Sequence, residues 1–216
     1  MEHDMDVKAA IRNGDADALR RLLGEDPSRA NGLIRWGNND CILTHPLHYV
    51  SDMLFEGKLE RGKELPLVEA LIHAGADLDF QRNGKNGKSD TPLIGAASLG
   101  AEDVGLMLLD AGARPERRGL FGETALHWAA LLGEVRLAGR LIEGADLNLK
   151  DDKYKSPPLG WAIHGWSDSP AGNHGRQREV VVLLVSGGAR VEPEWLESQK
   201  VRANPAMLAA LRAETI

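Results

Sequence analysis

The sequence predicts an all-α fold in which short helix-turn-helix units stack on one another. Four segments align without gaps, and their first residues are separated by 46, 33 and 33 positions. An apolar stretch that runs into Gly-Ala follows each segment, so two landmarks share one phase. Aromatic residues make up 5% of the chain, so a core would consist mainly of Leu, Ala, Val and Ile, as in closely packed helices. A fixed period of this kind predicts a repeat architecture.

Each aligned segment has the form of a helix start followed by a narrow helix. Thr91 and Thr124 stand where a hydroxyl can cap free amides, and Pro92 has the fixed φ that suits a first helical turn. Small Ala-Ala pairs let neighbouring helices approach, while a Leu in each segment fills the space between units. The segments are 45–50, 91–97, 124–130 and 157–163.

A second helix is expected after each segment, following a short turn. After the third segment, the spacing of Leu137, Leu141 and Ile142 is that of one buried helical face. Gly144 then ends this helix at a position suited to positive φ, as Gly112 does in the unit before it.

The 33-residue period, with a T-P-L-H-x-A-A type of segment followed by L-L-x-x-G-A-D, resembles the ankyrin repeat. Residues 124–146 are the best single match, and the resemblance covers roughly residues 7–192. It implies an all-α, ankyrin-repeat solenoid of stacked helix-turn-helix units joined by β-hairpin-like loops. It also implies a non-catalytic scaffold that binds another protein along a concave groove.

We expect one ankyrin-repeat domain over residues 1–216. Solenoids need caps that cover the apolar faces of their end units. Residues 7–23 read as a degenerate first helix pair, and two short helices are expected to start at Pro193 and Asn204, so we expect a complete single-domain chain. The expected boundaries are 7–44 for the N-terminal capping repeat, 45–90, 91–123, 124–156 and 157–192 for the repeats, and 193–216 for the C-terminal capping helices.

Two repeats carry insertions. The first full repeat has about 9 extra residues around Phe55 to Glu64, and the fourth has about 10 around Ser167 to Arg176. Loops inserted into a rigid scaffold often carry specific function, whereas a tolerated insertion without a function is an equal alternative.

Charge and composition disfavour several functional classes. The net charge is −6, which argues against binding nucleic acid or an anionic membrane through overall charge. The single cysteine, Cys41, cannot form an internal disulfide, and the first residues lack the basic and apolar regions of a signal peptide. No uncharged apolar run approaches the roughly 18 residues that span a bilayer. We therefore expect a cytoplasmic protein, and a monomer.

Aromatic residues recur at one place in three repeats. Tyr49, Trp128 and Trp161 share this place, on the side of the first helices that lines the groove in ankyrin-like stacks. Exposed aromatic rings favour binding because they bury much area with little loss of entropy. The predicted groove also includes residues about one turn further along, namely Asp52, Leu131, Leu132 and His164. The alternative is that the rings pack against one another or against the inserted loops.

The loops between repeats are rich in basic residues. Nine basic and three acidic residues give the segments 82–88, 114–118 and 148–155 a net charge of +6, against −12 for the rest. Such a basic rim would steer an acidic partner toward the loops, although a solvated turn surface explains it equally well. The rim residues are Arg82, Lys85, Lys88, Arg114, Arg117, Arg118, Lys150, Lys153 and Lys155.

Other chemistry is weighed against this interpretation. Cys41, His45 and His48 are individually capable ligands or nucleophiles, but their spacing matches no zinc pattern, and the resemblance gives His48 a structural role. His164 near Trp161 could belong to a small-molecule pocket. Nucleic acid or a small anionic ligand on the groove face is a second class of function, opposed by the acidic remainder. We predict no catalytic residue, metal or cofactor.

Overall fold

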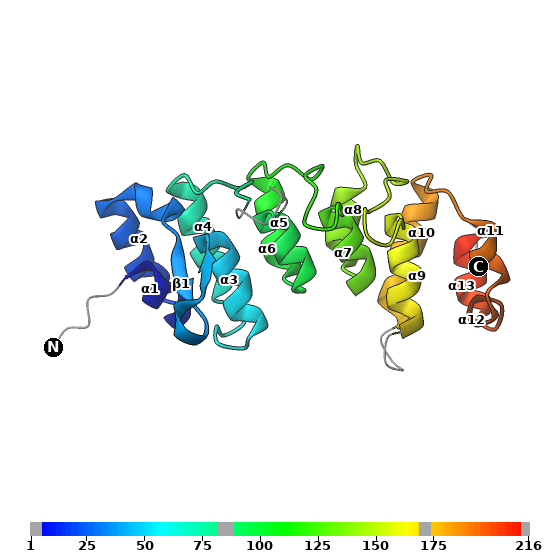
Figure 1. Ribbon diagram of the computed structural model, residues 1–216, viewed down its shortest axis with the longest axis horizontal. Coiled ribbons are helices and arrows are strands. Elements are labelled where there is room, and N and C mark those ends of the chain that lie inside the picture. The colour runs from blue at the N-terminus through cyan, green and yellow to red at the C-terminus, as the bar shows by residue number, and fades with distance from the viewer. Residues whose placement is uncertain (1–5, 82–88, 169–173, 213–216) are drawn as a thin grey trace. The chain divides into compact units, whose positions relative to one another are not determined.

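The computed structural model describes residues 6–81, 89–168 and 174–212. Helices dominate these residues, and the strand structure found among them is one two-stranded sheet. The chain forms two compact units, Met1–Arg117 and Arg118–Ile216. Within each unit, helices pair and the pairs stack side by side (Figure 1), which confirms the all-α class of stacked helix-turn-helix units.

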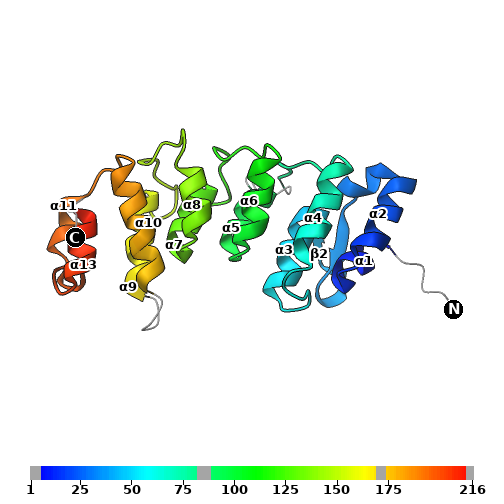
Figure 2. The ribbon, with the colours of Figure 1, turned by 180° about the vertical axis from the view of Figure 1, so that it is seen from behind.

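The first unit begins with the expected capping helices. Helix α1 is Val7–Asn13 and α2 is Ala16–Glu25, and a 3-10 turn, η1, follows at Pro27–Asn31. Asp6 and Asp15 cap the two helices by accepting hydrogen bonds from the amides of Ala9 (2.7 Å) and Ala18 (2.9 Å). Helix α1 packs against α3, and α2 packs against α4, as the view from behind in Figure 2 shows for the latter pair.

A β-hairpin that the sequence interpretation did not include lies between the cap and the first full repeat. Strand β1 (Ile34–Trp36) pairs antiparallel with β2 (Ile42–Thr44), and a 3-10 turn, η2 (Asn38–Asp40), lies between them. Ile34 and Thr44 are paired and both buried, so one face of the hairpin joins the core. The Trp36 ring meets the Tyr49 ring edge-on, with centroids 5.7 Å apart. The hairpin therefore covers the start of the next helix.

Two full helix pairs complete the first unit. They are α3 (Pro46–Phe55) with α4 (Glu64–His73), and α5 (Pro92–Ser98) with α6 (Glu102–Asp110). Residues 56–63 join the first pair, whereas residues 99–101 suffice for the second. The insertion thus forms the loop between α3 and α4, where Leu59 turns into the core, and Phe55 at the end of α3 is exposed.

The second unit repeats the helix pair with longer elements at its end. Helices α7 (Ala125–Leu132) and α8 (Val135–Leu141) are followed by α9 (Pro158–Asp168) and α10 (His174–Ser186). Helix α9 has 11 residues against 8 in α7, so part of the second insertion extends helices, and its residues 169–173 lie outside the described ranges. A Cβ atom at Gly165 would collide with the Leu131 carbonyl oxygen, so glycine permits the close contact of α7 with α9.

Three short helices follow α10, where the sequence predicted two. They are α11 (Pro193–Glu197), α12 (Gln199–Arg202) and α13 (Pro205–Leu211). The extra helix forms because the Ser198 hydroxyl accepts a hydrogen bond from the amide of Val201 (3.3 Å), which caps α12. Helix α13 packs against α10 and buries Met207 and Leu211. Among the described helices, none is both long enough and apolar enough to cross a membrane.

Candidate binding site

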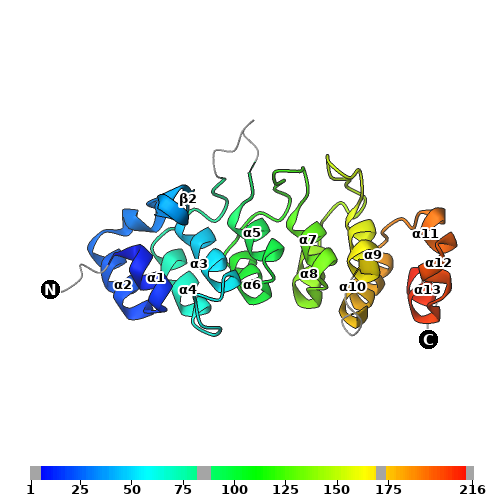
Figure 3. The same cartoon turned by 60° about the horizontal axis from the view of Figure 1, so that its bottom comes forward.

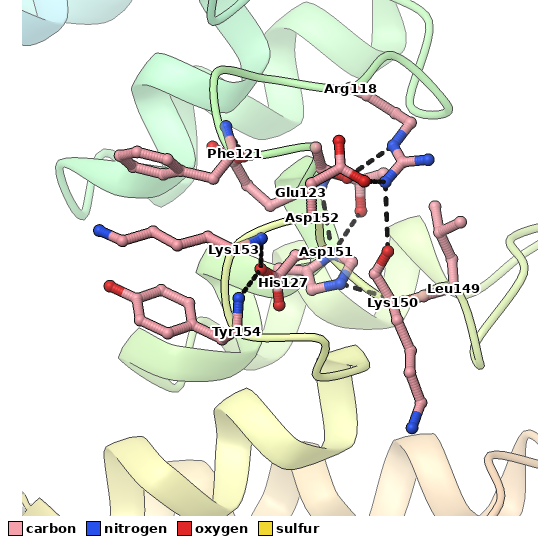
Figure 4. A network of polar contacts seen from close by, with 12 residues as sticks. Arg118, Phe121, Glu123, His127, Leu149, Lys150, Asp151, Asp152, Lys153 and Tyr154 are labelled. Atoms are coloured by element: carbon pink, nitrogen blue, oxygen red, sulfur yellow. Dashed lines mark hydrogen bonds and ion pairs between the residues drawn. The ribbon is translucent and has the colours of Figure 1, made fainter.

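The start of α7 is tied to the loop that precedes α9. His127 is fully buried, and its Nδ1 accepts a hydrogen bond from the amide of Thr124 (3.1 Å), so the ring hydrogen resides on Nε2. Nε2 then donates to the carbonyl oxygen of Leu149 (3.1 Å; Figure 4). Burial lowers the pKa of His127 to about 4, so the ring is neutral near pH 7. His127 has a structural role, since it holds residue 149 against α7.

A buried carboxylate organises the next part of that loop. Asp151 is 1% exposed, and its Oδ1 accepts from the amides of Lys153 (2.8 Å) and Tyr154 (2.6 Å). Its Oδ2 accepts from the amide of Ser156 and from Trp161 Nε1, each at 3.1 Å. Burial acts to raise the pKa of Asp151, but these four hydrogen bonds outweigh it and leave the pKa below its ordinary value. The ionised carboxylate thus fixes both the loop and the indole of Trp161.

The loop before α7 has a carboxylate in a corresponding role. Glu123 is buried, and it accepts hydrogen bonds from the amide of Phe121 (2.8 Å) and from Trp128 Nε1 (3.1 Å). Both indole nitrogens of the aromatic pair, those of Trp128 and Trp161, therefore donate to a carboxylate. Each carboxylate turns one tryptophan ring toward the same region.

Arg118 and one backbone bond join the two loops. The Arg118 guanidinium donates to the carbonyl of Gly122 (2.6 Å) in its own loop. It also donates to the carbonyl of Lys150 and to Asp152 Oδ1 in the other loop, both at 3.2 Å. The amide of Asp152 donates to the carbonyl of Phe121 (2.6 Å). Figure 4 shows this network, and Figure 3 shows the two loops, which precede α7 and α9, projecting on the same side of the second unit.

Three aromatic rings meet beside these loops. Trp161 is the central ring: its centroid lies 5.0 Å from that of Trp128 and 5.8 Å from that of Tyr154, and both neighbours stand nearly perpendicular to it. Edge-to-face contacts of this kind are favourable for aromatic pairs. Trp161 is 5% exposed, Trp128 is half-buried and Tyr154 is 60% exposed. The cluster therefore has a buried base and an accessible rim.

A pocket of about 360 Å³ opens at this cluster. Its size falls at the lower end of the roughly 300–1,000 Å³ typical of ligand pockets. Of the predicted groove residues, Trp128, Leu131, Trp161 and His164 line it. The sequence interpretation missed three further lining residues, Tyr154, Ser156 and Gly160. Tyr154 was the detectable one, because it is an aromatic residue within a loop between repeats.

Comparison with known proteins agrees with this architecture. Residues 59–151 match a family model described as "Ankyrin repeats (3 copies)". This part of the chain contains ankyrin repeats. The resemblance seen in the sequence is thus confirmed over these residues, which include all of α7 and the loop before α9 as far as Asp151.

Two curated proteins are similar to part of the chain. Over 79 residues it is 37% identical to "Inactive serine/threonine-protein kinase TEX14" of Bos taurus, covering 36% of this chain and 5% of that protein. Over 94 residues it is 36% identical to "Protein PhlB" of Serratia liquefaciens, covering 43% of this chain and 40% of that protein. The matched stretches span less than half the length of either relative.

The first unit places Tyr49 and Asp52 differently from the expectation. Tyr49 was expected to be exposed, but it is 1% exposed, because the β-hairpin lays Trp36 against it. Burial also raises the pKa of its hydroxyl. Asp52 is half-buried on α3. In the second unit, Leu132 is 39% exposed on α7 and lies outside the residues that line the pocket.

The predicted basic rim is partly neutralised by carboxylates of neighbouring loops. Arg114 Nε lies 2.6 Å from Asp79, and Lys150 Nζ lies 2.8 Å from Glu192. Arg118 is paired with Asp152, as described above. Arg117 is half-buried, and Lys153 and Lys155 are exposed. Arg82, Lys85 and Lys88 lie outside the described residues.

His45 and His48 have structural roles in the first unit, and Cys41 is exposed. His45 replaces Thr as the cap of α3: its Nδ1 accepts from the amide of Leu47 (3.3 Å), and its Nε2 faces Asn31 Oδ1 at 3.1 Å. Burial lowers the pKa of His45 to about 4. His48 Nε2 lies 3.0 Å from the carbonyl oxygen of Asp90. Among the described residues, no group of three His, Cys, Asp or Glu side chains could hold a metal ion.

Proposed function

We propose that this protein is a non-catalytic binding module that holds an acidic segment of a partner protein at the aromatic pocket and the lysine-bearing loop of its second unit. Ankyrin repeats generally serve as protein–protein interaction modules, and the family is generally non-enzymatic. The observation that carries the proposal is an apolar pocket with a rigid aromatic base beside exposed lysines.

The pocket has the character of an interface anchor point. Its base is fixed, because Trp161 donates to buried Asp151 and Trp128 donates to buried Glu123. A partner side chain entering the pocket would lose little entropy of the receptor and would bury aromatic area, which is typical of interface hot spots. Leu132 extends the exposed apolar surface on α7 beyond the pocket.

The candidates for chemistry support binding over catalysis. His45 and His127 have pKa values of about 4. Their ring nitrogens form hydrogen bonds that cap a helix or hold a loop against a helix. Asp151 is saturated with hydrogen bonds from its own loop and Trp161. A monomeric state and a cytoplasmic location are part of the proposal; the latter is supported by the single cysteine, which cannot form an internal disulfide.

The proposal is tested by partner capture with matched variants. Wild-type protein, Trp128→Ala and Phe55→Ala serve as baits, and the captured partner is then titrated with each purified protein. Phe55 is an exposed aromatic residue of the first unit and provides the control. We expect Trp128→Ala to weaken binding by roughly thirtyfold, as loss of a hot spot does, while Phe55→Ala leaves it unchanged. Equal affinity of all three folded proteins would contradict the proposal.

A salt titration distinguishes nucleic acid as the ligand. Binding to oligonucleotides releases counterions, so its log–log slope against salt is steep. A partner with one apolar anchor and a few carboxylates is expected to give a shallow slope. A steep slope with oligonucleotides, together with tighter binding than to the protein partner, would favour the nucleic-acid alternative.

A further inference from the structure

Lys153 is a positive charge held in a fixed place beside the pocket. Its Nζ lies 4.4 Å from the centroid of the Phe121 ring and 4.9 Å from that of the Tyr154 ring. Figure 4 shows the lysine side chain running between these two rings. Its backbone is also fixed, because its amide donates to Asp151. Cation–π contacts hold an ammonium group without cancelling its charge.

The same tyrosine belongs to the pocket and to the lysine clamp. Tyr154 lines the pocket and stands edge-on to Trp161, while its ring also contacts the Lys153 ammonium. A ligand group inside the pocket is therefore separated from a fixed cation by a single aromatic ring. This arrangement suits two adjacent groups of one ligand, an apolar group in the pocket and an anionic group outside it.

The charges around the pocket leave this cation available. The exposed carboxylates nearby are engaged: Asp152 pairs with Arg118, and Asp168 pairs with His164 (3.4 Å) and Lys200 (3.7 Å). The buried carboxylate of Asp151 is occupied by four donors. Within the described residues, no carboxylate lies within ion-pair distance of Lys153 or Lys155. The free charge beside the pocket is therefore positive.

We propose that the pocket recognises a bulky apolar side chain of a partner peptide and that Lys153 recognises an acidic residue directly next to it. This inference rests on the proposed function and specifies the ligand of the same site. The apolar side chain packs between Trp128 and Tyr154 over Trp161, and the acidic side chain meets the ammonium group that Phe121 and Tyr154 hold. A cationic neighbour would be repelled by Lys153.

The test uses blocked heptapeptides titrated into the full chain, with binding followed by tryptophan fluorescence and by heteronuclear NMR. The central position is leucine, phenylalanine or alanine, and its neighbour is glutamate, glutamine or lysine. We expect the tightest binding for leucine or phenylalanine beside glutamate. Replacing glutamate with glutamine is expected to weaken binding about two- to fivefold, as loss of one exposed ion pair does.

Two lysine variants and one tryptophan variant locate the preference. Lys153→Met retains the stem between the rings and is expected to abolish the preference for glutamate over glutamine while keeping that for leucine over alanine. Lys155→Met removes the same charge two residues away, where no aromatic ring among the described residues lies over the ammonium, and is expected to change the glutamate preference less than twofold. Trp128→Phe, chosen to preserve folding, is expected to reduce the preference for leucine over alanine.

Each other outcome decides against the inference. Selection of apolar residues through Trp128 with no preference for glutamate would overturn it and leave the proposed function standing. A glutamate preference that survives Lys153→Met, or depends equally on Lys155, would overturn it in the same way. A preference for lysine beside the apolar residue would also overturn the inference, because the site would then recognise a cationic residue in place of an acidic one. Absence of any peptide whose binding depends on Trp128 would overturn both the inference and the proposed function.

Discussion

Tyr49 and Trp161 stand at the same place in their repeats and are both buried, yet only one of them forms part of a pocket. Tyr49 is covered by Trp36 from the β-hairpin that precedes α3. Trp161 is approached instead by the loop before α9, which places Tyr154 at its edge and leaves about 360 Å³ open. The comparison teaches that a repeat position has no fixed accessibility, because the preceding segment decides whether it is covered or open.

The largest expected difference between Tyr49 and Trp161 is the loss of unfolding free energy when the polar atom of each ring is removed. Trp161→Phe removes the donor that faces buried Asp151 and leaves a small cavity, so we expect a loss of about 3 kcal/mol of unfolding free energy. Tyr49→Phe removes a hydroxyl only and is expected to cost less than about 1 kcal/mol. Urea denaturation followed by circular dichroism measures both. Comparable losses at the two positions would show that the Asp151 contact contributes little.

A second prediction compares the caps of the two units as the pH falls. His45 and His127 have pKa values of about 4 in the folded protein, against an ordinary value of 6.5. Since the unfolded chain binds protons first, stability is complete above about pH 6.5 and is lost as the pH falls toward 4, by up to about 3 kcal/mol for each histidine.

Denaturation midpoints measured from pH 7 to pH 4 check this loss. His45→Thr supplies the residue found at the corresponding place before α5 and α7, where it caps those helices. It is expected to flatten the pH dependence while leaving stability at pH 7 within about 1 kcal/mol. An unchanged slope in His45→Thr would mean that His45 does not gain a proton on unfolding in this range.

A third comparison concerns glycines inside helices α5 and α9. A Cβ at Gly165 would collide with the backbone carbonyl of Leu131, whereas one at Gly95 would meet His48 Cδ2 at 3.2 Å, an atom that can shift slightly. We expect Gly165→Ala to cost about 1–3 kcal/mol. For Gly95→Ala the gain in helix propensity, about 1 kcal/mol, offsets the contact. Thermal unfolding of the two variants measures the difference, and a neutral Gly165→Ala would show that α7 and α9 can separate freely.

The smallest expected effect is that of Lys153→Met on stability. Two exposed cation–π contacts contribute about 0.5–1 kcal/mol each at most, and the methionine stem retains part of the packing. We therefore expect a change below about 1 kcal/mol in the free energy of unfolding, measured by urea denaturation. A larger loss would indicate that Lys153 is a structural residue of the loop, and its binding effects would then have to be separated from unfolding.

The helices could be predicted because their signals are local and repeated. Thr91 and Thr124 precede their helices as expected, and Gly112 and Gly144, expected at helix ends, adopt positive φ. The β-hairpin could not be predicted because its strands have three residues each, too few to show an alternating pattern of apolar and polar residues. The extra helix α12 depends on a single capping hydroxyl, that of Ser198.

The candidate site could be predicted only in part. Trp128, Leu131, Trp161 and His164 line one pocket because helical phase places them on one side of α7 and α9. The burial of Tyr49 could not be predicted, since it depends on Trp36 of the preceding hairpin, which the sequence interpretation did not include. Neutralisation of Arg114 by Asp79 also depends on contacts between loops 35 positions apart, which no local pattern encodes.

The Asp151 carboxylate determines which residues of the loop before α9 could be substituted to change its binding surface. Because one buried side chain fixes the amides at 153, 154 and 156 together with the indole at 161, the backbone of this loop owes its form largely to one residue. The side chains at 153, 154 and 155 point outward from that frame and are exposed. A library varied at positions 153 and 154, with Asp151 retained, would therefore change specificity while keeping the loop backbone, and the loop becomes a natural starting place for directed evolution of new binders.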